Sequence, residues 1–154
     1  MAELINSPKG GKASGVQPPS LLPDYKKQGK ANRAAGKRFE LKVRQDLESK
    51  GWIVFRNSND VIDEKFKQTT GHWNPFTHSI MTAQSGFPDF ICIKAHDLSK
   101  PETYQVKFVE CKLGKYLDKK EKEKCRWIID KLYIKVMVAY KGDKRGEIIY
   151  EDFI

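Results

Sequence analysis

Hydrophobic positions after the first thirty residues follow a helical period. Phe39, Val43 and Leu47 recur every fourth residue, and Gly51 stands where such a helix would stop. The spacing predicts that order begins near Asn32 with a helix of roughly four turns.

Five later segments have the composition of strands, with β-branched, aromatic or alternating apolar residues. They cover residues 52–55, 87–94, 104–112, 135–140 and 147–150. The second and third segments are separated by a longish loop, and we expect them to pair as a hairpin.

A second helix is predicted between the third and fourth of these strands. Asp118, three residues before Glu121, has the pattern of a capping box, and Cys125, Ile128 and Leu132 follow at helical spacing. The element order is therefore αβββαβ with a terminal strand. This order indicates an α/β fold, in which helices pack on a mixed central sheet of four to five strands.

Residues 57–85 show no clear period, apart from a short helix expected around residues 61–66. A connection of this length in a small domain is usually functional or mobile. It carries His72 and His78, whose spacing suits one face of neither a helix nor a strand. We interpret both histidines as loop residues rather than metal ligands.

Charge adds the first indication of a partner. The chain has 154 residues, with 29 Lys and Arg against 20 Asp and Glu, and a formal net charge of +9. Such a surplus attracts polyanions, including nucleic acids. No uninterrupted apolar run exceeds five residues, which is too short for a membrane-spanning helix, and the N-terminus lacks the pattern of a secretory signal.

The remaining composition concerns location and domain organisation. The three cysteines form no CxxC pair, so we expect buried thiols in a reducing compartment and an intracellular protein. Residues 1–30 combine Gly, Pro and Ser with scattered Lys and predict a flexible basic arm, either a plain solvated leader or a non-specific grip on DNA. Residues 31–154 are expected to form one folded domain.

The candidate chemistry lies on the predicted hairpin. Residues two apart on a strand point to the same face, so Glu110 and Lys112 project together while Val109 and Cys111 face the other side. Asp89 begins the partner strand. Carboxylate oxygens are the ligands of hard divalent cations, and Asp89 with Glu110 therefore predicts a Mg²⁺ site.

This grouping suits hydrolysis of a phosphodiester bond. A Mg²⁺ ion on the two carboxylates would polarise a phosphate oxygen, while Lys112 would steady the attacking water or the transition state. Glu40 lies at the edge of the apolar stripe of the first helix, where it can approach the sheet as a metal ligand or as a neighbour of one. The alternative is structural, with Glu110 and Lys112 as a surface ion pair and Asp89 as a strand cap.

Two motifs carry a resemblance to a known family. Gly86-Phe87-Pro88-Asp89 and Glu110-Cys111-Lys112, within the αβββαβ order, resemble the PD-(D/E)xK nuclease superfamily over residues 33–142. Within it the chain resembles the archaeal and viral Holliday junction resolvases. The VRR-NUC group, which acts on branched or flapped DNA and whose Gly-x-Pro-Asp signature is also matched, is a close alternative.

The resemblance implies a restriction-endonuclease-like fold and assigns roles to four residues. Asp89 and Glu110 would be metal ligands for Mg²⁺, with Mn²⁺ as a substitute. Lys112 would be the catalytic lysine, and Glu40 the acidic residue of the first helix.

Basic residues near these positions are candidates for binding DNA phosphates. Residues 112–126 carry a net charge of +4 and begin at the proposed site. The candidates on this segment and on the first helix are Lys37, Arg38, Lys42, Arg44, Lys115, Lys119, Lys120 and Lys124. Trp73 or Phe76, in the long connection, is predicted to contact an opened junction, and the alternative is that these aromatics anchor the connection on the domain.

The function expected from these features is a Mg²⁺-dependent DNA endonuclease for branched DNA such as four-way junctions, in recombination or repair. Symmetric cutting of a junction needs two sites and so implies a homodimer, for which Tyr150 and Phe153 are candidate surface residues if they are not simply core. Three alternatives stay open: a flap or end-processing nuclease, an inactive DNA-binding module, and a packaging protein that holds nucleic acid passively. Nothing in the sequence distinguishes DNA from RNA.

Overall fold

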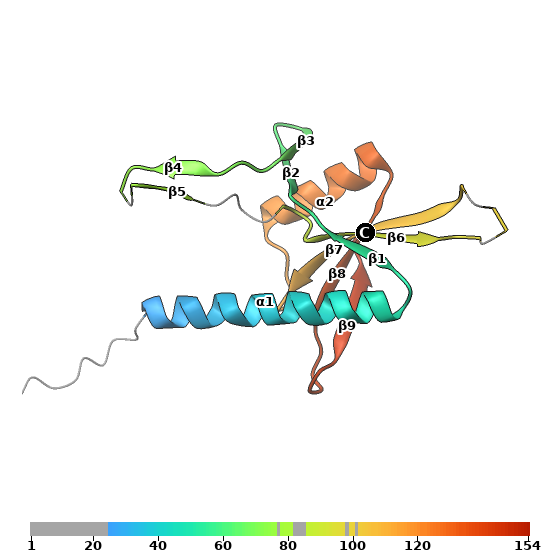
Figure 1. The fold of residues 1–154 in the computed structure, drawn as a ribbon, viewed down its shortest axis with the longest axis horizontal. Coiled ribbons are helices and arrows are strands. Elements are labelled where there is room, and N and C mark those ends of the chain that lie inside the picture. Colours follow the sequence, from blue (N-terminus) through green and yellow to red (C-terminus); the bar gives the residue numbers. More distant parts are fainter. Residues whose placement is uncertain (1–24, 77, 82–85, 98, 101) are drawn as a thin grey trace, which may run out of the picture.

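A computed structural model describes residues 25–76, 78–81, 86–97, 99–100 and 102–154, and in this part of the chain two helices pack against a mixed sheet (Figure 1). The helices are α1 (Tyr25–Ser49) and α2 (Lys119–Leu132). The five strands of the central sheet are β1 (Ile53–Arg56), β6 (Phe90–Ala95), β7 (Tyr104–Lys112), β8 (Lys135–Lys141) and β9 (Ile148–Asp152). The predicted α/β class and the mixed sheet are confirmed.

The order of strands in the sheet is β1-β6-β7-β8-β9. The predicted hairpin of β6 and β7 is antiparallel, with Phe90 opposite Val109. β7 and β8 run parallel, with Glu110 opposite Val138, and α2 makes the crossover that a parallel pair requires. The start of β6 and the end of β7 therefore meet near the middle of the sheet.

Helix α1 covers one face of this sheet. Its predicted stripe of Phe39, Val43 and Leu47 is buried and packs with Cys92 and Val109 of the two central strands. The helix begins at Tyr25 rather than near Asn32, because its first turns are rich in Lys, Gln and Ala, which favour helix without an apolar stripe. It includes residues 25–30 of the segment predicted as a flexible arm, and residues 1–24 lie outside the described residues.

Helix α2 covers the opposite face. Cys125 and Ile128 are buried against strand residues such as Phe108. The predicted capping box is confirmed, since the Asp118 side chain accepts a hydrogen bond from the backbone of Glu121 and the Glu121 side chain accepts one from the backbone of Asp118.

The connection between β1 and β6 is where the sequence prediction was wrong. Instead of a helix around residues 61–66, strands β2 (Asn59–Ile62) and β3 (Lys65–Gln68) form a hairpin that places Val61 opposite Phe66. Its two turn residues, Asp63 and Glu64, both have positive φ, as a two-residue hairpin turn requires. Phe66 stacks on Phe108 of β7, with ring centroids 5.8 Å apart, so this hairpin belongs to the packed body.

Strands β4 (His72–Asn74) and β5 (Ser79–Met81) form a second hairpin in the same connection. Figure 1 shows this hairpin projecting away from the central sheet. Neither α1 nor α2 is long and apolar enough to cross a membrane, and no other helix occurs in the described ranges.

The predicted burial of the cysteines is confirmed for two of the three. Burial raises the pKa of Cys92 to about 11 and that of Cys125 to about 12, as expected of thiols inside the core, whereas Cys111 is half-buried. Tyr150 and Phe153 pack against the two core clusters, and the Tyr150 hydroxyl donates to Asp46 at 2.6 Å. Both are thus partly core residues.

Candidate active site

The strand pairing brings Asp89, Glu110 and Lys112 together. Asp89 directly precedes β6, and the register of Phe90 opposite Val109 sets Asp89 beside Glu110. The predicted same-face relationship on β7 is present, with Lys112 Nζ 3.0 Å from Glu110 Oε1.

Backbone hydrogen bonds fix the two carboxylates. The Glu110 carboxylate accepts from the backbone N–H of Asp89 at 3.2 Å, and the Asp89 carboxylate accepts from the backbone N–H of Cys111 at 2.8 Å. Each acidic side chain is thus held by the other strand, and both strands must be in register for the pair to form.

Both carboxyl groups are held in an environment that disfavours their charged forms. Glu110 is only 5% exposed, and burial together with the charge of Asp89 raises its pKa to about 8. Burial, and then the charge of Glu40, raise the pKa of Asp89 to about 6 against the opposing effects of the Cys111 N–H and Lys112.

Lys112 lies between two acidic side chains. Its ammonium contacts Glu110 and also donates a short hydrogen bond to Glu121 of α2. Burial disfavours the charged amine, but the two carboxylates outweigh this effect and raise the pKa of Lys112 above its usual value. The lysine is therefore a fixed cation and donor at neutral pH rather than a base.

Glu40 reaches the same region from α1. Its carboxylate lies 3.9 Å from Arg56, the last residue of β1, and its charge contributes to the raised pKa of Asp89. A cleft of about 240 Å³ opens beside it, lined by Lys37, Glu40, Leu41, Arg44, Arg56 and Phe90. All four predicted catalytic residues thus gather at the end of the sheet where β6 begins and β7 ends.

The donor set fits a divalent cation that is held by few protein ligands. In the ranges that the structure describes, no three His, Cys, Asp or Glu side chains form a metal-holding group. Mg²⁺ commonly takes only one or two carboxylates and completes its shell with water and substrate phosphate. Asp89 and Glu110 supply that pair, and a cation between them would relieve the unfavourable burial of two like charges.

The turn before Asp89 depends on a residue that the sequence analysis missed. Asn57, 2% exposed, donates from its side chain to the carbonyl of Pro88 at 2.8 Å, and its backbone N–H donates to the carbonyl of Asp89 at 2.8 Å. Gly86 packs so closely against this segment that a Cβ would lie 2.3 Å from the carbonyl oxygen of Asn59. The Gly-x-Pro-Asp motif therefore needs glycine at position 86, because there is no space for a side chain.

Two further missed residues are Glu121 and Arg56. Glu121 was identified only as part of a capping box, yet its second oxygen holds Lys112. Arg56 ends a strand and has no motif around it, so no signal in the sequence points to its partner Glu40.

The structure divides the predicted phosphate-binding residues. Lys37 and Arg44 line the cleft beside Glu40, whereas Arg38 and Lys42 line a different cleft. Lys119 and Lys120 are exposed in the first turn of α2.

Three members of that set are engaged within the protein, the first being Arg44, which pairs with Glu48 at 2.8 Å. Lys115 pairs with Glu151 at 3.1 Å, and Lys124 pairs with Asp60 at 2.7 Å, so both amines already have a carboxylate partner.

Trp73 and Phe76 are not brought to the carboxylates. Trp73 is 58% exposed and Phe76 93% exposed, on the hairpin that projects from the sheet (Figure 1). The Trp73 ring lies edge-on to His78, with centroids 6.4 Å apart. A contact between these aromatics and DNA stays a prediction.

Comparison of the chain with protein-family models, with curated proteins and with solved structures gives no match.

Proposed function

We propose that the protein is a metal-dependent endonuclease that hydrolyses phosphodiester bonds in branched DNA. The observation that carries the proposal is the half-buried group of Asp89, Glu110 and Lys112, which Glu40 approaches from α1. Two adjacent carboxylates and a fixed ammonium are the side chains that metal-assisted phosphoryl chemistry requires. We propose further that the sheet and helices form a restriction-endonuclease-like core, as the two motifs on β6 and β7 suggest.

In this proposal Asp89 and Glu110 hold Mg²⁺, or Mn²⁺ in its place. The bound cation supplies Lewis acidity and lowers the pKa of a water ligand. Lys112 donates hydrogen bonds to the attacking water or to a phosphate oxygen, because the carboxylates on either side keep it protonated. Glu40 adds negative charge at the cation, and Arg56 orients Glu40.

The surroundings support a polyanionic substrate. Lys37 and Arg44 border the cleft beside Glu40, and the chain carries a net charge of +9. Such contacts position the DNA backbone without reading its sequence. Selection of branched DNA, a homodimer with two active sites and an intracellular location complete the proposal, and they rest on the resemblance of the motifs.

The test is cleavage of end-labelled four-way junction, flap, linear duplex and single-stranded DNA, with an RNA duplex alongside, in Mg²⁺ or in EDTA. Wild type is compared with Asp89→Asn and with a matched control, Asp130→Asn, at an exposed position of α2. We expect metal-dependent cutting of the junction that is lost only in Asp89→Asn. Cutting of flaps or ends instead would support the proposed active site but change the proposed substrate. Binding without cutting in all three proteins would overturn the proposed enzymatic activity.

A further inference from the structure

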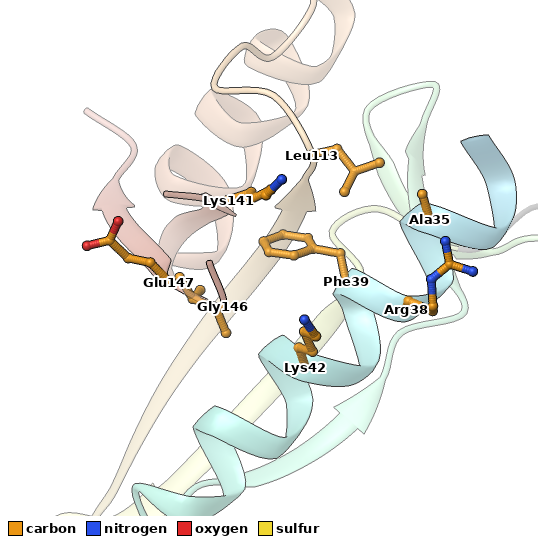
Figure 2. A pocket seen from close by; sticks show the side chains of 9 residues that line it. Ala35, Arg38, Phe39, Lys42, Leu113, Lys141, Gly146 and Glu147 are labelled. Carbon is orange, nitrogen blue, oxygen red and sulfur yellow. The ribbon is translucent and has the colours of Figure 1, made fainter. Parts of the chain in front are cut away.

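A second cleft lies between α1 and the turn that joins β8 to β9 (Figure 2). It is lined by Ala35, Arg38, Phe39, Lys42, Leu113, Lys141, Gly146, Glu147 and Ile148. Phe39 precedes Glu40 on α1, and Leu113 follows Lys112 at the end of β7. Leu113 thus faces the α1 side of the sheet, whereas Lys112 contacts Glu121 of α2 on the other side.

The cleft has room for one small ring. Its volume is about 160 Å³, and a protein cavity of about 150 Å³ accepts benzene. Leu113 is 45% exposed there, and Figure 2 shows the ring of Phe39 pointing from α1 into the space between Leu113 and Lys42. Together with Ile148 these side chains give the cleft an apolar floor.

Three basic side chains surround this floor without a counter-charge. Arg38, Lys42 and Lys141 line the cleft, and within the described ranges none of them lies within 4.0 Å of a carboxylate. By contrast, Arg44 and Lys50, on or just after the same helix, pair with acidic residues four positions away. Cations without partners favour an anionic ligand, although in Figure 2 the Arg38 guanidinium points away from the Phe39 ring.

Glu147 carries the one carboxylate that lines the cleft, and this carboxylate is hydrogen-bonded within the turn between β8 and β9. Glu147 accepts a hydrogen bond from the backbone N–H of Lys144 at 3.1 Å, and its side chain packs on Gly142, where a Cβ would lie 2.3 Å from the Glu147 Oε2 atom. In Figure 2 its carboxylate points away from Phe39. The turn therefore directs the Glu147 carboxylate away from the apolar floor.

We propose that this cleft binds one unpaired nucleotide, with a pyrimidine-sized base against Leu113 and Phe39 and the flanking phosphates on Arg38, Lys42 and Lys141. A ring-sized apolar floor inside a rim of cations matches a nucleotide, in which a flat ring and a phosphate lie close together. A base that is paired and stacked in a duplex cannot enter such a cleft, so the nucleotide must be unpaired. The inference rests on the proposed function and deepens it, because it assigns the substrate class as branched DNA with an unpaired nucleotide.

The experiment measures binding in EDTA, where no cutting occurs, by fluorescence anisotropy. The probes are a junction with one unpaired thymidine at the branch, the same junction with an abasic residue there, and free thymidine monophosphate as competitor. We expect the intact base to bind about tenfold more tightly than the abasic site, a preference that Leu113→Asn removes. Lys141→Gln is expected to weaken both complexes, and Lys131→Gln, an equal loss of charge on α2, is expected to leave them unchanged.

Equal binding of the intact and abasic junctions by wild type would overturn the proposal, as would equal losses in Lys141→Gln and Lys131→Gln. Competition by free thymidine monophosphate at the concentration of the DNA would assign the cleft to free nucleotides and also overturn it. Asp89→Asn distinguishes this inference from the proposed function, since it should abolish cutting in Mg²⁺ while leaving base-dependent binding in EDTA intact. If wild type cuts the junction but shows no preference for the intact base, the nucleotide-binding proposal is wrong and the proposed nuclease function stands.

Discussion

The carboxylate of Glu110 accepts a hydrogen bond from the backbone N–H of Asp89, 3.2 Å away across the β6–β7 pair. The two acidic side chains are thus fixed next to each other by the sheet itself, and burial raises the pKa of both groups. The metal-free site is therefore a source of instability that a cation or a proton relieves.

The first prediction concerns the pH dependence of stability. The pKa of Asp89 rises from 3.8 to about 6 and that of Glu110 from 4.5 to about 8, so the folded state binds protons more tightly than the unfolded chain. This contribution to the free energy of unfolding is complete below about pH 4. It is lost as the pH rises through the pKa values of the two groups in the folded state. We expect the free energy of unfolding of metal-free protein to fall between pH 5 and pH 8 by more than the ~1.4 kcal/mol to which one pKa unit corresponds.

Urea unfolding at a series of pH values in EDTA measures this change. The Glu110→Gln variant is the control, because a neutral amide cannot titrate, and its stability should depend less steeply on pH. A wild-type stability that stays level or increases from pH 5 to pH 8 would contradict the prediction.

The second prediction concerns the metal. Burial and the charge of Asp89 raise the pKa of Glu110 toward neutral pH, and metal ligands must be deprotonated to bind. Binding of Mg²⁺ or Mn²⁺ should therefore release protons near pH 7 and raise Tm. Calorimetric titration in two buffers of different ionisation enthalpy counts the protons. Heat that is the same in both buffers, or a Tm that rises equally in Asp89→Asn, would argue against this site.

The local pattern of the sequence predicted the pair on β7 because the period of a strand is local. Glu110 and Lys112 must share a face wherever β7 lies. The position of Asp89 followed from the hairpin. Arg56 and Asn57 were beyond prediction, since their partners Glu40 and Pro88 are distant in sequence and only the folded sheet brings them near.

The β2–β3 hairpin was mistaken for a helix for a different reason. Its turn is formed by Asp63 and Glu64 in the left-handed region, where Asn and Gly are the usual signal. Without that signal, Ile62 and Phe66, four residues apart, fit a helical period, although Phe66 pairs with Val61 across two strands. The positive φ angles of this turn are evident only in the paired strands, and the sequence alone does not show them.

The third prediction separates two roles of Glu121. One oxygen accepts from the backbone of Asp118 at the start of α2, and the other accepts from Lys112. Glu121→Gln keeps an oxygen for the cap but loses the charge beside Lys112, and we expect a lower rate of cutting with little loss of stability. Glu121→Ala loses both contacts and should also lower the free energy of unfolding by about 1 kcal/mol.

The readouts are the pH profile of cutting and urea unfolding. Because Glu121 helps to raise the pKa of Lys112, the loss of activity at high pH should begin at a lower pH in Glu121→Gln than in wild type. An unchanged profile together with unchanged cutting would restrict Glu121 to the cap.

The last prediction tests why the motif before Asp89 contains glycine. At Gly86 a Cβ would lie 2.3 Å from the carbonyl oxygen and 2.6 Å from the backbone nitrogen of Asn59, so Gly86→Ala must displace backbone. We expect a loss of about 1–3 kcal/mol in stability, as for other overpacked sites. Because the same segment carries Asp89, cutting should fall further than the stability loss alone explains. Gly36→Ala is the matched control: nothing lies within 4 Å of its Cβ, and alanine in a helix should add about 0.5–1 kcal/mol. Urea unfolding measures the change in the free energy of unfolding for both variants. Equal changes would mean that the turn before Asp89 accommodates a side chain and that lack of space does not explain the glycine in the motif.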